Sequence, residues 1–506
     1  MWPHGDARVP NAGSEAKPPS SRHTTSYCPP AMQIHDAHLA ANTTDSRALW
    51  RAELGATVKL AWPIALTQLG QVAMMTSDLV LIGHLGEASL AAAALAQTVL
   101  FAAFVLGMGI VSAVAPLCAQ AFGAREPRMV RRSLRVGLWA ALMLGVPMTA
   151  LQYFGEDVLR LLGEDATSAH LAGIYLLGLG WSLVPGWWFI ALRGFMGAVN
   201  RPEPALWITL VAIPANTLLA YALIHGAFGL PQLGLLGAGV GTTTVNLAMC
   251  IAGFRIAYAQ RPFRKFRVLG RFWRIDWPLL GELIAVGAPI AGAFLLEYGL
   301  FAIAAIMMGW IGTVALAAHQ VALQTAAILF MVPFGISMAA TVRVGHAVGR
   351  HDAGAARRAG FAAIGLGAAF MATMVLVIVG CRHVIPILFL GPPNDVEASS
   401  TIALAATLLA FGSTFFVADG VQTIAAGALR GLNDTRVPLL FAAVSFWAIG
   451  FATSYTLAFT AGLQAIGIWS GFTVGLAVYA ALLVWRFNAL TRRGYMPETP
   501  GHVVMH

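Results

Sequence analysis

The chain has 506 residues, of which 58% are apolar and only 10% are charged. A typical soluble domain has about 25% charged residues. A soluble fold of this length could not cover its surface with so few charged side chains. The four cysteines, Cys28, Cys118, Cys250 and Cys381, are scattered without the spacing of a metal site or a disulfide framework. The composition therefore indicates a membrane protein and excludes a disulfide scaffold or a disordered chain.

Residues 1–50 differ from the rest of the chain, because Pro, Ser, Thr, Asn and His dominate and no apolar stretch occurs. A secretory signal peptide is not expected, since no hydrophobic core follows the first residues. This composition favours a disordered tail. Met32 is an alternative start of translation, and the helical part is expected to begin near Ser46 or Arg47.

Long charge-free runs define the expected membrane spans. A helix needs roughly 20 apolar residues to cross the hydrocarbon core, so the runs 204–254 and 437–485 each hold two helices and a turn. A membrane β-barrel needs alternating segments of about 10 residues, which these continuously apolar runs do not provide. We therefore predict an all-α polytopic membrane protein. Its twelve transmembrane helices are expected at 56–82, 89–118, 133–154, 167–191, 204–225, 235–258, 279–308, 314–342, 358–381, 399–426, 437–459 and 465–486.

The chain repeats itself at a shift of 226 residues. Pro63 matches Pro289, and Gly83 matches Gly309. Because six helices return the chain to the side where it started, the two halves have the same orientation. Such parallel repeats suit alternating access around a central cavity. The predicted units are an N-terminal six-helix bundle at 51–258, a basic cytoplasmic linker at 259–278 and a C-terminal six-helix bundle at 279–488.

Basic residues determine the expected orientation, because cytoplasmic loops carry an excess of Lys and Arg. Of the 31 Lys and Arg, only Arg160 and Arg382 fall on one side of the predicted membrane. The opposite side is expected to be the cytoplasmic side of the cell inner membrane, with the tails 1–50 and 489–506 both inside. The formal charge of +9 then reflects topology and attraction to anionic lipid headgroups, and not nucleic-acid binding.

Three carboxylates are expected inside the membrane: Asp78 in the first helix, Glu297 in the seventh and Asp419 in the tenth. A charge at the bilayer centre costs at least ~2.5–3.5 kcal/mol. One interpretation is a protonated carboxyl that a neighbouring helix satisfies. However, none of the three has an acidic counterpart in the other half, and Glu297 matches Gln71. An architectural carboxyl would be expected in both halves, so this asymmetry favours a functional role.

The expected depths of Glu297 and Asp419 differ. Glu297 lies past the middle of an outward-running helix, and Asp419 lies about 20 residues into an inward-running one. Straight helices would separate the two carboxyls by about 15 Å at 1.5 Å per residue. A shared ion therefore requires a bent helix, or helix edges that differ from the expected ones by one or two turns.

No catalytic motif competes with transport, since HExxH, GxSxG, Walker A and GxGxxG before a strand are all absent. We expect that the protein is not an enzyme and needs no cofactor, and that its transport takes energy from an ion gradient. His319 is more consistent with a helix contact than with a ligand. Other polar, aromatic and methionine side chains are candidates for the cavity wall, although each alone is more often a helix contact or core residue. They are Gln68, Gln71, Asn216, Asn246, Gln324, Gln422, Met74, Met75, Trp187, Trp188, Phe415 and Phe416.

Three segments of the C-terminal half resemble the multidrug and toxic compound extrusion (MATE) family, NorM branch. They are Ala-Ala-His-Gln-Val-Ala-Leu at 317–323, Arg-Val-Gly-His at 343–346 and Ala-Ala-Gly-Ala-Leu-Arg-Gly at 425–431. The resemblance covers about residues 50–490. It implies cation-coupled export of cationic, aromatic drugs, and a small-molecule substrate is the expected partner of what we expect to be a monomer.

The resemblance also implies roles for individual residues. Glu297 and Asp419 match the pair that forms the cation site in this branch, for Na⁺ or H⁺. Asp78 matches an aspartate that related branches use for protons, and Asn216 matches an asparagine near it. Phe415 stands where the family often has a tyrosine. The alternative function is a lipid-linked sugar flippase of the same superfamily, which would prefer a cationic cavity.

Overall fold

The computed structural model describes residues 31–161, 163–268, 270, 272–392 and 396–497, with side chains from residue 47 onward. The chain divides into one unit that ends at Leu49 and a second that begins at Trp50. All regular structure in these described residues is helical. The N-terminal half contains α1 (Ala31–Gly83), α2 (Glu87–Ser112), α3 (Val114–Gly123), α4 (Pro127–Tyr153), α5 (Gly155–Leu161), α6 (Ala166–Leu179), η1 (Gly180–Ser182), α7 (Leu183–Ala198), α8 (Glu203–His225) and α9 (Gly234–Ala259).

The C-terminal half repeats this order with similar lengths. It contains α10 (Trp277–Ile311), α11 (Thr313–Gly349), α12 (Ala353–Cys381), α13 (Val384–Leu390), α14 (Val396–Phe411), α15 (Ser413–Gly431), α16 (Arg436–Ala442), α17 (Ala452–Tyr455) and α18 (Gln464–Arg492), with π-helical turns on both sides of α17. The short helices η2 (Ala227–Gly229) and η3 (Phe263–Phe266) lie in connections of the first half and the linker.

The described residues contain eleven helices long and apolar enough to cross a membrane, and the bent pair α14–α15 makes a twelfth span. The predicted twelve-helix, all-α fold is therefore confirmed. Several helices continue past their expected ends, because a helix persists where its first charged residues reach the membrane surface. For example, α11 runs to Gly349 and α18 runs to Arg492.

The expected disordered tail differs from the structure in part. Residues 31–49 are helical and belong to α1, whereas residues 1–30 lie outside the described part of the chain, as do 498–506. Alanine and leucine recur in 31–49, and these residues have high helix propensity. Local propensity therefore extends α1 beyond the apolar segment that predicted it.

The tenth span is bent by 50° at Gly412, between α14 and α15. A Cβ atom at Gly412 would lie 2.9 Å from the indole ring of Trp469 and 2.8 Å from the carbonyl oxygen of Leu408. The bend therefore depends on glycine, because no side chain fits between the helix and this ring. The corresponding span of the first half is interrupted at η1.

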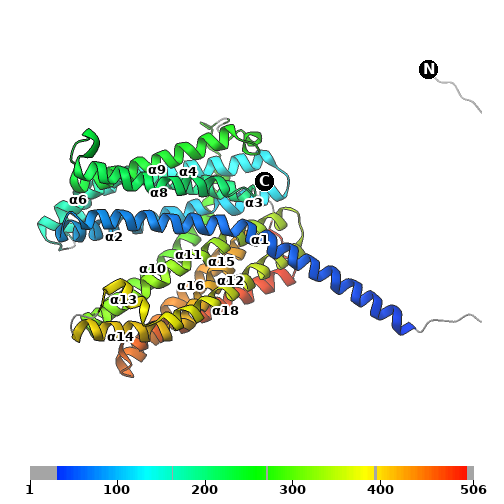
Figure 1. The fold of residues 1–506 in the computed structure, drawn as a ribbon. Coiled ribbons are helices and arrows are strands. Elements are labelled where there is room, and N and C mark those ends of the chain that lie inside the picture. Colours follow the sequence, from blue (N-terminus) through cyan, green and yellow to red (C-terminus); the bar gives the residue numbers. More distant parts are fainter. Residues whose placement is uncertain (1–30, 162, 269, 271, 393–395, 498–506) are drawn as a thin grey trace, which may run out of the picture. The chain divides into compact units, whose positions relative to one another are not determined.

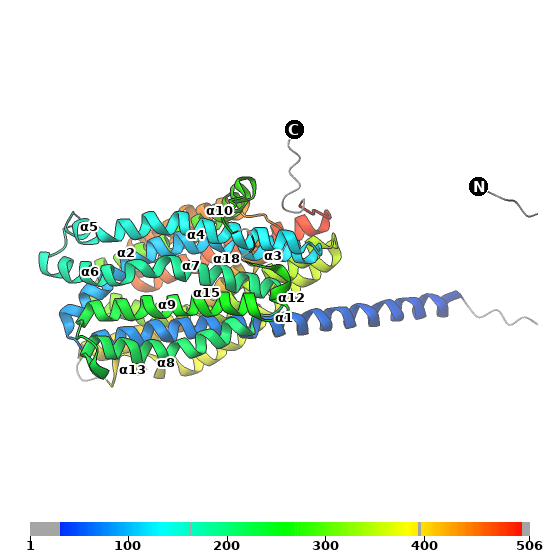
Figure 2. The ribbon, with the colours of Figure 1, turned by 90° about the horizontal axis from the view of Figure 1, so that it is seen from above.

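Within residues 50–497 the two halves form two bundles, as Figure 1 shows by the blue-to-green and the green-to-red helices. Figure 2 shows the long helices of the first half, among them α4, α7 and α9, running side by side. The bundles meet where α2 packs against α10 and α3 against α11. Figure 1 also shows them spreading apart toward the ends marked by α6 and α14.

Polar contacts join the halves at the end with the basic loops. Arg343 donates from Nε and Nη2 to the carboxylate of Glu53, at 2.8 and 2.7 Å. The amide nitrogen of Gln120 donates to the carbonyl oxygen of Gly431 at 2.9 Å. These contacts hold one end of the molecule together while the other end is spread.

Candidate functional site

A central cavity of about 530 Å³ lies between the two bundles. Its wall receives side chains from α1, α2, α6, α7 and α9 of the first half and from α10, α11 and α15 of the second. Asp78, Glu297 and Asp419 all reach this wall, and none of the described residues that form it is Lys, Arg or His. The three carboxylates singled out in the sequence therefore share one cavity.

Glu297 and Asp419 share a hydrogen-bond partner. The amide nitrogen of Gln422 donates to Glu297 Oε1 at 2.9 Å and to Asp419 Oδ1 at 3.1 Å. Asp419 and Gln422 lie one turn apart on α15 and are 6% and 2% exposed. Gln422 was expected in the cavity wall and instead lies behind it, between the two carboxyls.

The expected separation of Glu297 and Asp419 is corrected by the bend at Gly412. Because α15 begins at Ser413, Asp419 lies in its second turn and not deep in one straight helix. The changed direction of α15 brings Asp419 beside the middle of α10, where Glu297 lies. The two carboxyls therefore lie within hydrogen-bond reach of one amide nitrogen.

Asp78 forms a second polar group in the first half. The amide of Asn216 on α8 donates to Asp78 Oδ1, and the hydroxyl of Thr242 on α9 donates to Oδ2 at 2.9 Å. Asp78 is 5% exposed and Asn216 is fully buried. The sequence suggested the pairing of Asp78 with Asn216 through the family resemblance but gave no signal for Thr242.

A third polar group surrounds Arg193, which lies two residues past the fourth expected helix, 167–191, on the side expected to be cytoplasmic. The structure corrects this placement: α7 continues to Ala198, and Arg193 is 4% exposed inside it. Its Nη1 donates to Gln68 Oε1 and, at 2.9 Å, to Gln71 Oε1. Both glutamines belong to α1 and line the cavity. Arg193 was missed because a charge next to an apolar run was taken as the end of the helix.

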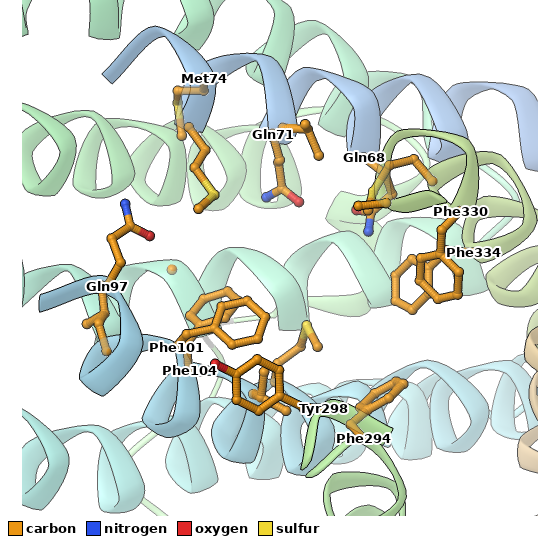
Figure 3. Close-up of a pocket in the computed structure, with 18 of the residues that line it drawn as sticks. Gln68, Gln71, Met74, Gln97, Phe101, Phe104, Phe294, Tyr298, Phe330 and Phe334 are labelled. Carbon is orange, nitrogen blue, oxygen red and sulfur yellow. The ribbon is translucent and has the colours of Figure 1, made fainter. Parts of the chain in front are cut away.

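Aromatic rings and methionines make the rest of the wall largely apolar. The rings of Phe101 on α2 and Tyr298 on α10 meet across the two halves, with centroids 5.0 Å apart. Figure 3 shows these rings, with Phe104 and Phe294, across the cavity from the glutamines of α1. Such faces attract cations as well as apolar groups.

The other expected wall residues divide into two groups. The first group lines the cavity, as expected, and consists of Met74, Met75, Asn246 and Phe415. The side chains outside it are Asn216, Gln324, Trp187, Trp188 and Phe416.

The expectation for Gln324 is corrected, because its side chain is exposed. The cavity-facing positions of α11 are Leu323, Ala326, Ala327, Phe330 and Phe334. They recur at the helical period, and Gln324 points away from that stripe.

His319 is fully buried, and its ring stands against that of Trp469, with centroids 5.9 Å apart. Neither ring nitrogen of His319 has a hydrogen-bond partner among the described residues. Within the same residues, no three or more His, Cys, Asp or Glu side chains gather as a metal-binding group. A helix contact remains the simplest role for His319.

Two helix bundles in the same orientation, with a cavity between them, define the architecture of an alternating-access transporter. The MatE family model matches residues 63–222 and 289–456. The chain therefore belongs to the MatE family and is a multi-pass membrane protein. The two matches begin 226 residues apart, which is the shift of the internal repeat.

Relatives and solved structures agree with this assignment. The chain is 62% identical over 443 residues to the probable multidrug resistance protein NorM of Rhodopseudomonas palustris, covering 88% of this chain and 93% of that protein. The fold matches the Vibrio cholerae MATE transporter VcmN with a TM-score of 0.79 at 16% identity, over 89% of this chain and 100% of that one. It matches the eukaryotic MATE transporter AtDTX14 with a TM-score of 0.78 at 22% identity, over 88% of this chain and 99% of that one.

Proposed function

We propose that the protein is a multidrug efflux antiporter of the cell inner membrane, which exports cationic, hydrophobic or aromatic compounds in exchange for Na⁺ or H⁺. Its 62% identity to a protein named for multidrug resistance supports the efflux of drugs. The apolar, ring-lined wall with three carboxylates supports a cationic and aromatic substrate. Both termini lie in the cytoplasm, on the side of the basic loops.

The observation that carries the coupling site is the shared partner of Glu297 and Asp419. Gln422 uses its amide nitrogen on one oxygen of each carboxylate. The second oxygens of the two carboxylates are then the ligands available to the coupling ion. Oxygen ligands of this kind suit Na⁺, and a proton binds to the same carboxylate oxygens.

The transport cycle follows from competition between the ion and the cationic drug for the negative charge of the cavity wall. In the outward-open state the ion binds at Glu297 and Asp419 and neutralises part of the acidic wall. A cationic drug then loses its electrostatic attraction and leaves to the outside. The cavity, now free of drug but still holding the ion, reopens inward. There the ion dissociates, and the carboxylates attract the next drug. The ion shifts the equilibrium because it binds the two states with different affinity.

A lipid-linked sugar flippase is the alternative function. Its pyrophosphate substrate would need cationic side chains in the cavity, and the described residues of the wall include three carboxylates and no Lys or Arg. The charge of the wall therefore favours the export of cations.

Dye transport in inside-out membrane vesicles tests the proposal. A Na⁺ gradient and a proton gradient, each directed out of the lumen and imposed separately, should reveal which ion drives dye uptake. Glu297→Gln and Asp419→Asn keep the size of each side chain and remove its charge, so each should abolish the driven uptake while the protein still reaches the membrane. Wild-type uptake in both variants would contradict the assignment and leave Asp78 as the candidate.

A further inference from the structure

A buried arginine lies behind the cavity without an acidic partner. Arg193 is 4% exposed and makes no ion pair with any described residue. Burying a guanidinium is costly unless it is paired or hydrogen-bonded. Its hydrogen-bond partners are the side-chain oxygens of Gln68 and Gln71, three residues apart on one face of α1. The positive charge is therefore solvated by two amides and neutralised by neither.

Arg193 determines which way these amides face. A guanidinium has five N–H donors and no acceptor, so each glutamine must present Oε1 to it. The NH₂ group of each amide is then turned away from Arg193. Gln68 and Gln71 both line the central cavity, and Figure 3 shows both side chains projecting from α1 toward it. No described residue accepts a hydrogen bond from either NH₂ group.

We propose that Gln68 and Gln71 form a carboxylate-binding subsite in the first-half wall of the cavity, with Arg193 as the positioning residue behind them. The amide NH₂ groups donate to the two oxygens of a substrate carboxylate. The charge of Arg193, relayed through the two polarised amides, favours an anionic acceptor over a neutral one. The inference rests on the proposed function and deepens it by assigning residues that would bind the carboxylate of a substrate that also carries a cationic group.

The internal repeat supports a role in recognition. Gln71 corresponds to Glu297 at the shift of 226 residues, and both side chains line the cavity. At this pair of equivalent positions, the first half therefore presents an amide donor and the second half presents a carboxylate. A zwitterion finds a partner for each of its charges on opposite walls. A purely architectural arginine would require neither glutamine to face the cavity.

The test uses two dyes that differ in one charge. Rhodamine B carries a xanthylium cation and a free carboxylate, and its ethyl ester carries the cation alone. Binding of each dye to the full-length protein in lipid nanodiscs is measured by fluorescence polarisation, without an ion gradient. The variants are Gln71→Leu, which removes the donor, and Gln71→Glu, which pairs with Arg193 and turns an acceptor toward the cavity. Gln324→Leu is the matched control, because that glutamine is exposed outside the cavity wall.

Loss of one hydrogen bond to a charged group should raise the Kd of rhodamine B about tenfold in Gln71→Leu. The increase should be larger in Gln71→Glu, because the new carboxylate repels that of the dye. The ester should change by less than about twofold in Gln71→Leu, the range of a substitution without a specific partner. Gln324→Leu should leave both dyes at the wild-type Kd.

Two results would overturn the subsite. One is an equal loss of affinity for both dyes, which is expected if the glutamines only stabilise Arg193. The other is wild-type affinity for rhodamine B in both Gln71 variants. Neither result bears on ion coupling, because no gradient is present. The proposed function fails separately, if neither ion gradient drives transport of the ester in vesicles.

Discussion

Replacing Gln422 by leucine should stop ion-driven transport while leaving drug binding intact. The side chain is 2% exposed and donates to Glu297 Oε1 at 2.9 Å and to Asp419 Oδ1 at 3.1 Å. Leucine fills a similar volume, so the packing of α15 against α10 and α11 is retained. What changes is that the empty, ionised site loses the donor that serves both carboxylates.

The magnitude follows from the two lost hydrogen bonds. Each bond to a charged group contributes about 1.5–3 kcal/mol, so emptying the site of its ion becomes harder by at least about 3 kcal/mol. This free energy corresponds to a roughly hundredfold change in an equilibrium constant. Because the cavity must release the ion in every cycle, we expect turnover in Gln422→Leu to fall by about the same factor.

The assay compares dye uptake by inside-out vesicles with dye binding to the purified protein. Gln422→Leu should bind the ethyl ester of rhodamine B and fail to accumulate it under either gradient. Gln324→Leu is the control, because it makes the same substitution at an exposed position of α11. Wild-type turnover in Gln422→Leu would refute the argument that this amide holds the coupling site together.

Three further predictions address the first half, the orientation and the bend. Asp78→Asn should retain more ion-driven dye uptake than Glu297→Gln, because the proposed coupling site lies in the second half. Equal losses would place a second coupling group in the first half. In a cysteine-free background, a cysteine at Leu230 should react with a membrane-impermeant maleimide added to whole cells and one at Lys265 should not; the reverse pattern would contradict a cytoplasmic N-terminus. Gly412→Ala forces a Cβ atom to within 2.9 Å of an indole ring, so it should cost about 1–3 kcal/mol, seen as a lower Tm, and an unchanged Tm would show that the bend tolerates a side chain.

The twelve spans could be predicted because membrane insertion depends on a property that the sequence displays directly. A helix in hydrocarbon must satisfy its own backbone and expose few charges, so apolar length marks each span. The repeat was equally accessible, since glycines and prolines such as Gly83 and Gly309 keep their spacing between the halves. The ends of the helices were harder to predict from the sequence, because α11 and α18 continue where their charged residues reach the membrane surface.

The bend between α14 and α15 at the proposed coupling site could not be predicted in the same way. Gly412 is one of 53 glycines in the chain, and a glycine in an apolar run is compatible with a straight helix. Its effect depends on Trp469, which approaches from α18 and leaves no space for a Cβ atom. The contact joins residues 57 positions apart in the sequence, and no local pattern reports it. Glu297 and Asp419 could therefore be proposed as partners, but their common bond to Gln422 could not.

Arg193 illustrates a different limit. An arginine beside an apolar run usually marks the membrane surface, and burial becomes acceptable only when acceptors surround it. Here the acceptors are Gln68 and Gln71, more than 120 residues earlier in the chain. Each glutamine alone is compatible with an ordinary contact between helices. Only the three side chains together reveal a buried cation whose partners face the cavity.

The two walls differ in which of them changes its charge during the proposed exchange. At the equivalent positions Gln71 and Glu297, Arg193 turns the acceptor of one side chain away from the cavity, while Gln422 leaves one oxygen of the other available. Ion binding at Glu297 therefore removes negative charge from one wall, and the positive charge behind the opposite wall persists. A cationic drug then meets a cavity whose potential has become less negative. In an apolar cavity such changes act over several ångströms, because screening there is weak. Because Arg193 keeps its charge in both states, the drop in the cation's affinity in the proposed exchange comes from the ion at Glu297 and Asp419 and not from the arginine.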